Sequence, residues 1–222
     1  MNTVLRKSLF KTLSYFKYDK NFIVLFLMFN IFLSVSQGIA YQELSNLVSE
    51  LQLLIRLLMT FIQTWVTIIM VIRFKCFFEA DSIQENIISS LRAATLLTPR
   101  FIYYSLMYVS MATLGIILFI IPGIYILVTY FYVPFLSILN DESEGSYFQH
   151  SKNYAEGFYP YLFLFVLILL GSELSIEYLN SHLMGESLNT FFLASLYLPL
   201  GGVSGLVYCW SISLLLSRMK EI

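Results

Sequence analysis

The chain has 222 residues, of which 58% are hydrophobic and only 12% are charged, and its mean hydropathy is +0.76. Soluble domains usually carry about 25% charged residues, so this composition predicts an all-α membrane protein and excludes a disordered chain. The formal net charge of −1 argues against a nucleic-acid partner, and the two isolated cysteines, Cys76 and Cys209, match no metal or redox motif.

The N-terminal segment, residues 1–20, is basic and precedes the first long apolar segment. Leu5, Leu9, Leu13 and Phe16 recur along it at helical spacing, which predicts an amphipathic helix. No small-residue cleavage site followed by a soluble domain comes next, so we expect the first apolar segment to stay in the membrane. Such a helix lies in the headgroup layer, or packs against neighbouring spans as a connecting elbow, and the sequence leaves both open.

Six apolar segments follow, each close to the 20 or so helical residues that cross a bilayer. They are residues 21–40, 53–72, 100–121, 123–139, 161–179 and 191–216. The third and fourth come from one run, residues 101–140, without a charged residue or a histidine. Pro122 and Gly123 lie near its midpoint, where proline removes a backbone donor and glycine permits a tight reversal. The pair therefore predicts the turn of a transmembrane hairpin. One long kinked helix is the alternative, but it would overshoot the bilayer about twofold.

The basic residues are distributed very unevenly between the two sides of this arrangement. Twelve of the 13 fall before the first span, after the sixth, or in the two loops on that side: Arg6, Lys7, Lys11, Lys17, Lys20, Arg73, Lys75, Arg92, Arg100, Lys152, Arg218 and Lys220. Only Arg56, at the outer end of the second span, departs from this pattern. Positive charge is retained in the cytoplasm, so we expect both termini to be cytoplasmic.

A repeated unit is visible along the chain. Residues 81–98 and 143–159 form amphipathic patterns like that of the N-terminal segment. The segments beginning at Ser90 and Ser151 align without gaps, with coincident alanines and prolines at an offset of 61 residues. The sequence thus predicts one membrane domain, residues 1–222, with pseudo-repeats 1–76, 77–140 and 141–222. Each repeat would be a cytoplasmic amphipathic helix followed by a transmembrane hairpin.

One stretch resembles a known family. It contains Pro122-Gly123 followed by Ile124-Tyr125, then Pro134, the acidic pair Asp141-Glu142, Ser151 and Gly157. This order resembles the six-helix membrane domain attached to some bacterial glycerophosphodiester phosphodiesterases, and related stand-alone proteins of bacterial inner membranes. The catalytic domain of those enzymes is a separate soluble barrel of roughly 250 residues. The present sequence contains no such segment, so the resemblance implies a membrane module and no phosphodiesterase activity.

Few residues are candidates for catalysis or for binding a metal or cofactor. The sequence contains no HExxH, GxSxG or P-loop motif, and we predict no catalytic residue, cofactor or metal. Glu173 and Glu177 lie one helical turn apart and could share a cation, although acidic residues are expected on an outer face that excludes lysine and arginine. Arg56 and Gln63 are polar residues within the second span and are functional candidates, although Arg56 can extend to the interface.

Three functions fit these observations. The first is a non-enzymatic module of a bacterial inner or plasma membrane that binds lipid or a partner membrane protein in envelope maintenance. The second is the permease subunit of an ABC exporter, including the bacteriocin-immunity type, which would require a separate ATPase. The third is an intramembrane enzyme, which the lack of a catalytic constellation disfavours.

Overall fold

The computed structural model describes residues 2–29, 32, 49–80, 87–139, 146–183 and 190–220. These residues are helical apart from short turns, and none of them is in a strand, which confirms the predicted all-α class. The helices are α1 (Asn2–Tyr18), the helix Lys20–Phe29, α3 (Ser49–Ala80), α4 (Ile87–Leu118), α5 (Ile120–Thr129), α6 (Val133–Leu139), α7 (Ser146–Ala155), α8 (Tyr159–Leu183) and α9 (Thr190–Met219).

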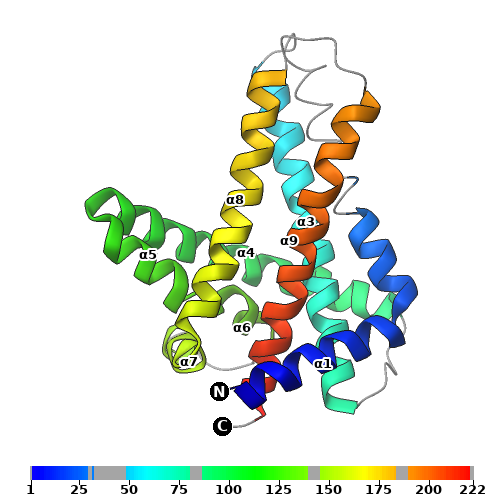
Figure 1. The fold of residues 1–222 in the computed structure, drawn as a ribbon, viewed down its shortest axis with the longest axis vertical. Helices are drawn as coiled ribbons and strands as arrows, with labels where there is room; N and C mark the ends of the chain where they lie inside the picture. The colour runs from blue at the N-terminus through cyan, green and yellow to red at the C-terminus, as the bar shows by residue number, and fades with distance from the viewer. Residues whose placement is uncertain are drawn as a thin grey trace.

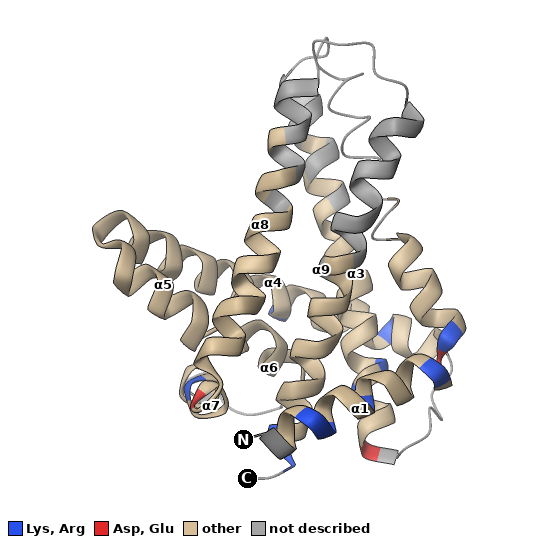
Figure 2. Cartoon of the chain, viewed as in Figure 1, with Lys and Arg blue, Asp and Glu red and all other residues tan. Residues whose placement is uncertain are grey.

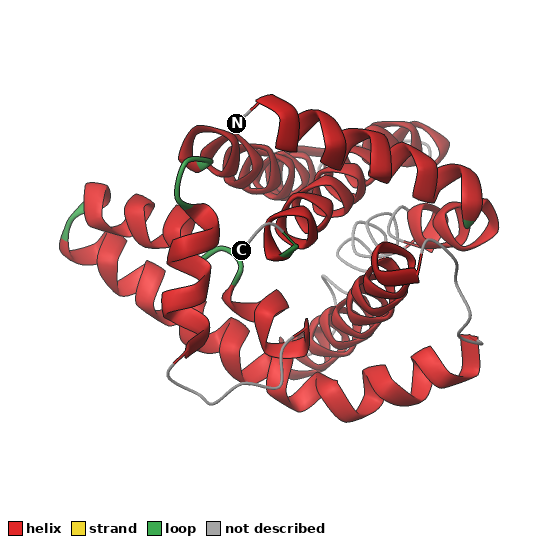
Figure 3. Ribbon diagram, turned by 90° about the horizontal axis from the view of Figure 1, so that it is seen from below, coloured by secondary structure: helices red, strands yellow, loops and turns green. Residues whose placement is uncertain are grey.

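Three long helices, α3, α8 and α9, run side by side along the longest axis of the molecule (Figure 1). The hairpin formed by α4 and α5 lies crosswise to them, and α1 crosses their lower end. Seen from below, α1 and α4 run along opposite sides of the long helices (Figure 3). Both ends of the chain lie at this lower end.

The core lies where α1, α3, α4, α6, α7, α8 and α9 meet. Its largest fully buried side chains are aromatic and aliphatic: Tyr15, Phe26, Ile68, Met70, Phe74, Tyr132, Leu136, Tyr147, Leu162, Phe165 and Ile212. Many of the rings pack at angles, as Tyr104 does against Tyr147 with centroids 5.0 Å apart. The buried side chains that the structure describes therefore lie mainly toward one end of the long helices.

The described part of the chain contains three helices that are long and apolar enough to cross a membrane. They are Thr60–Glu79, Ile87–Leu118 and Ile120–Leu139, and the bent pair Tyr147–Ala155 and Tyr159–Ser172 would make a fourth. Lys20–Phe29 and Gly205–Met219 are shorter apolar helices that belong to the expected first and sixth spans. These helices fit a membrane protein, whereas the count of six spans stays a prediction.

The second amphipathic segment is not a separate helix, contrary to the expectation. Its described part and the third apolar segment form the single 32-residue helix α4, with Pro99 in its interior. The buried stripe Ser90, Ala94 and Thr98 continues into Phe101 and Tyr104 without a break. Packing of this face on neighbouring elements supports one continuous helical segment across Pro99, although the proline removes a backbone hydrogen bond.

The hairpin turn was placed wrongly at Pro122 and Gly123. The chain reverses at Phe119, the only residue between α4 and α5, which is extended (φ −156°, ψ 130°). Pro122 is the third residue of α5, where a backbone N–H has no partner inside the helix, so proline is tolerated there. Gly123 instead allows α5 to approach α4, since a Cβ built on Gly115 would lie 2.9 Å from the Gly123 Cα.

The expected fourth span, which lies within the candidate Ile120–Leu139, contains a turn. Residues 130–132 form a turn between α5 and the short helix α6, which is buried throughout. Pro134 is the second residue of α6, and its carbonyl accepts a 2.6 Å hydrogen bond from the Ser137 hydroxyl. This segment therefore turns into the core after α5.

The third amphipathic segment is a connecting elbow. The helical spacing of residues 143–159 predicts an apolar stripe of Tyr147, Ser151, Tyr154, Ala155 and Phe158, and all five side chains are buried in the bundle. The chain then bends by 106° into α8. Gly157 lies in this bend with φ +83°, a backbone conformation that glycine adopts readily and other residues rarely do.

Candidate functional site

The residues of the family motif have structural roles. The buried Ser151 hydroxyl donates a 2.9 Å hydrogen bond to the Thr129 carbonyl, and so satisfies the C-terminal end of α5. Gly123 provides a close helix contact, Pro134 opens α6 and Gly157 permits the α7–α8 bend. The structure does not gather these residues around a common cavity.

Of the polar candidates within the spans, Gln63 alone has a side chain that the structure describes. Gln63 is half-buried on α3, and its carbonyl accepts a 2.9 Å hydrogen bond from the Thr67 hydroxyl. The side chains of Arg56, Glu173 and Glu177 lie outside the described residues, so the expected shared cation stays a prediction. Within the described ranges, no group of three or more His, Cys, Asp or Glu side chains could hold a metal ion.

A buried ion pair that was not predicted from the sequence joins α3 to the junction between α1 and the helix Lys20–Phe29. Arg73 Nε and Nη2 donate to one carboxylate oxygen of Asp19 at 2.9 and 2.8 Å. The side chains are only 7% and 13% exposed, and the guanidinium also lies 4.7 Å from the centre of the Phe22 ring. Asp19 is the single residue between α1 and the helix Lys20–Phe29, so the pair fixes the angle at which α1 leaves the bundle. A single aspartate after a basic segment does not by itself predict an ion pair. Arg73 entered the sequence analysis only as one of the basic residues that indicate the cytoplasmic side.

Tyr15 completes this cluster. Its hydroxyl lies 3.4 Å from the Asp19 carboxylate as a hydrogen-bond donor, and its ring packs 4.2 Å from that of Phe74. Burial, and secondarily the Asp19 carboxylate, raises the pKa of Tyr15 far above its ordinary value. The hydroxyl donates to Asp19 and the ring packs on α3, so Tyr15 helps the ion pair to anchor α1.

The basic residues gather at one end of the described structure (Figure 2). Several of them satisfy the C-terminal ends of helices from other elements. Lys75 donates to the Leu139 carbonyl at the end of α6 at 2.9 Å, and Lys220 donates to the Phe78 carbonyl near the end of α3. A cation at a helix C-terminus is favoured by the helix dipole. The charge asymmetry in the sequence therefore has a packing role as well as a topological one.

Helix α1 packs on the bundle through Tyr15 and small polar residues, and it leaves other large apolar side chains exposed. Ser8 and Thr12 are buried, and the Ser213 hydroxyl of α9 donates to the Ser8 carbonyl at 2.8 Å. Leu9 and Leu13 are 43% and 54% exposed. Because small residues allow close helix approach, α1 needs only one narrow face for packing. A second, apolar face remains without a partner in the described structure.

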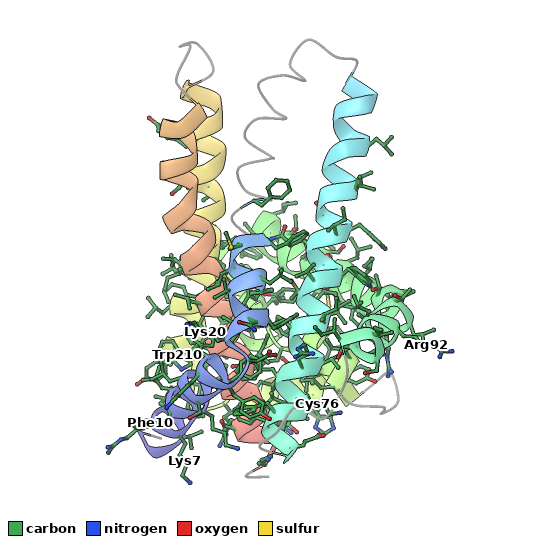
Figure 4. The ribbon with its side chains drawn as sticks, turned by 90° about the vertical axis from the view of Figure 1, so that its right-hand side faces the viewer. Lys7, Phe10, Lys20, Cys76, Arg92 and Trp210 are labelled. Carbon is green, nitrogen blue, oxygen red and sulfur yellow. The ribbon has the colours of Figure 1, made fainter. Side chains whose placement is uncertain are left out.

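A pocket lies between α1, the end of α3 and the end of α9. Its volume is about 610 Å³, and it is lined by Val4, Arg6, Lys7, Phe10, Lys11, Phe78, Ser217 and Lys220. Phe78 is central, because the Lys11 ammonium lies 4.9 Å from its ring centre and Lys220 binds its carbonyl. Figure 4 shows Lys7 and Phe10 on α1 at the lower end of the molecule. We define these eight residues as the cationic pocket.

The sequence analysis did not identify this pocket. The spacing of Lys7 and Lys11, one helical turn apart, was a visible signal that two lysines share a face of α1. The approach of Lys220 to the same place, more than 200 residues later, depends on the packing of α1 against α9. Comparisons with protein-family models, curated proteins and solved structures give no match, so the resemblance to the membrane-domain family rests on the motif residues alone.

Proposed function

We propose that this chain is a non-enzymatic membrane module that contacts lipid through α1. The observation that supports this most directly is the exposed apolar face of α1, at Leu9 and Leu13, beside the basic residues Arg6 and Lys17. Helices that carry an apolar face and a basic face lie in the interface of a membrane, with the apolar side among the acyl chains. The alternative, an elbow packed on the bundle, describes α7 but not this face of α1.

The orientation of the module follows from its charges. The basic residues and both chain ends lie at the same end of the molecule (Figures 1 and 2), which would be the cytoplasmic side of a bacterial inner or plasma membrane. With α3, α8 and α9 along the membrane normal, α1 would lie parallel to the cytoplasmic surface. In this orientation the hairpin of α4 and α5, which runs crosswise to those three helices, would not cross the bilayer. A role in envelope maintenance would follow from lipid contact at that surface.

Spin labelling tests the proposal. Leu13→Cys is labelled in a Cys76→Ser background, since Cys209 is buried and should not react. The matched control is Ser14→Cys, which is also exposed but turned by about 100° around the helix. In vesicles, we expect collisions with oxygen, which dissolves in lipid, to dominate at position 13 and collisions with a water-soluble nickel chelate to dominate at position 14.

Two outcomes would contradict the proposal. If both labels collide mainly with the nickel chelate, α1 does not lie in the membrane interface. If the protein purified in mild detergent carries a stoichiometric ATPase, the chain is the permease subunit of an ABC exporter, and a label at position 13 that the ATPase shields would place that partner on α1.

A further inference from the structure

We propose that the cationic pocket binds the phosphate headgroup of an anionic phospholipid whose acyl chains run over the exposed face of α1. This deepens the proposed function and rests on it. Four lining residues carry positive charge: Arg6, Lys7, Lys11 and Lys220. Among the described residues that line the pocket, none is acidic. A concave site of this composition favours a ligand with at least one negative charge.

The remaining lining residues indicate that the ligand is an amphiphile. Val4, Phe10 and Phe78 contribute apolar surface, and the Ser217 hydroxyl adds a hydrogen-bonding group. A small inorganic anion would leave this apolar surface without a partner and would occupy little of the 610 Å³. Sites that bind organic ligands combine a mostly apolar lining with a few placed polar groups, as this one does.

The pocket opens onto the apolar face of α1. Phe10 lines the pocket and is 56% exposed, and Leu13 follows it by three residues on the outer side of the helix. Leu9 is next to Leu13, one turn earlier along the chain. The lysines of the pocket therefore lie on the same helix as Phe10, Leu13 and Leu9, so a bound phospholipid would place its headgroup on the cations and its acyl chains along these apolar side chains. Arg6 and Lys17 project from the same outer face, at angles between Phe10 and Leu13. Basic pockets between membrane helices at the cytoplasmic surface are suited to such headgroups.

The test is a titration of the detergent-purified full chain with phosphatidylglycerol, followed by native mass spectrometry. The double variant Lys7→Gln/Lys11→Gln removes two cations from the pocket. The control, Lys20→Gln/Lys152→Gln, removes two exposed cations outside both the lining and α1, and changes the net charge equally. We expect the first variant to weaken binding by roughly 30-fold, from about fivefold for each lysine, and the second by less than about threefold.

The outcomes are distinct. Equal weakening by both variants, or no weakening by either, would overturn the pocket and indicate diffuse surface attraction. If zwitterionic phosphatidylcholine binds as tightly as phosphatidylglycerol, the pocket does not select for negative charge. Competition by soluble glycerol phosphate at the same concentration as the lipid would show that the site takes a free phosphate compound. Each of these results leaves the spin-label test of α1 unaffected, so failure of the pocket and failure of the lipid-contacting module can be told apart.

Discussion

Replacing Gly123 by alanine should destabilise the fold by forcing α4 and α5 apart. A Cβ at this position would lie 2.7 Å from the Ile116 Cα and closer still to the Ile116 nitrogen and Cγ1. Carbon atoms in contact normally lie about 3.5–4.0 Å apart, so the helices must separate by roughly 1 Å. Overpacking of this kind costs about 1–3 kcal/mol, and we expect the upper end because two of the three atoms belong to the backbone.

Gly171→Ala is the matched control. Gly171 lies in the interior of α8, and a Cβ there would meet nothing within 4 Å. Both substitutions gain about 0.5–1 kcal/mol from the higher helix propensity of alanine. The difference between their free energies of unfolding therefore isolates the steric term. The measurement is unfolding by SDS in mixed micelles, followed by the fluorescence of Trp65 and Trp210.

Adding Ile116→Ala distinguishes the steric explanation from others. That change removes Cγ1 but leaves the backbone nitrogen and Cα in place, so it should not restore the stability of Gly123→Ala. If Gly123→Ala unfolds at the same SDS fraction as Gly171→Ala, the close approach of α4 and α5 does not exist as described. Full rescue by Ile116→Ala would show that only the side chain, and not the backbone, limits the approach.

Three further changes test other features by the same unfolding assay. Asp19→Asn should lower the free energy of unfolding by about 3–5 kcal/mol, because it leaves the buried Arg73 guanidinium without a counter-charge. Adding Arg73→Met should restore part of this loss. An unchanged free energy of unfolding would mean that water already solvates the pair. Gly157→Ala should lower the free energy of unfolding by about 1–2 kcal/mol because of the positive φ alone, since a Cβ there would meet no atom within 4 Å. Gly157→Asn should cost less, and equal costs for the two variants would contradict this backbone explanation. Pro99→Ala should raise the free energy of unfolding by about 1–3 kcal/mol, whereas Pro160→Ala, in the first turn of α8, should leave it almost unchanged. Equal effects of the two changes would mean that α4 is not continuous at Pro99.

Local patterns in the sequence identify the helices and several of their faces. The apolar runs predict α3, α4, α8 and α9 because only a helix satisfies its own backbone in lipid. The stripe from Tyr147 to Ala155 predicts the buried face of α7 correctly. The candidate functional site was harder to predict, because the cationic pocket combines residues from α1, α3 and α9, and Asp19 is significant only through its contact with Arg73.

The sequence by itself determined that this chain is helical, apolar and basic at one end, because these properties depend on composition and on spacing within single segments. Tertiary structure alone decided how the segments bend. The aligned stretches from Ser90 and Ser151 bury equivalent serines and alanines, yet the first continues within the single helix α4 and the second turns by 106° into α8. At the bend, the second has Gly157 where the first has Leu96, and a leucine rarely adopts the positive φ that the turn requires. Whether a glycine adopts this positive φ depends on the surfaces against which the flanking helices pack. Those surfaces come from segments far apart in the chain.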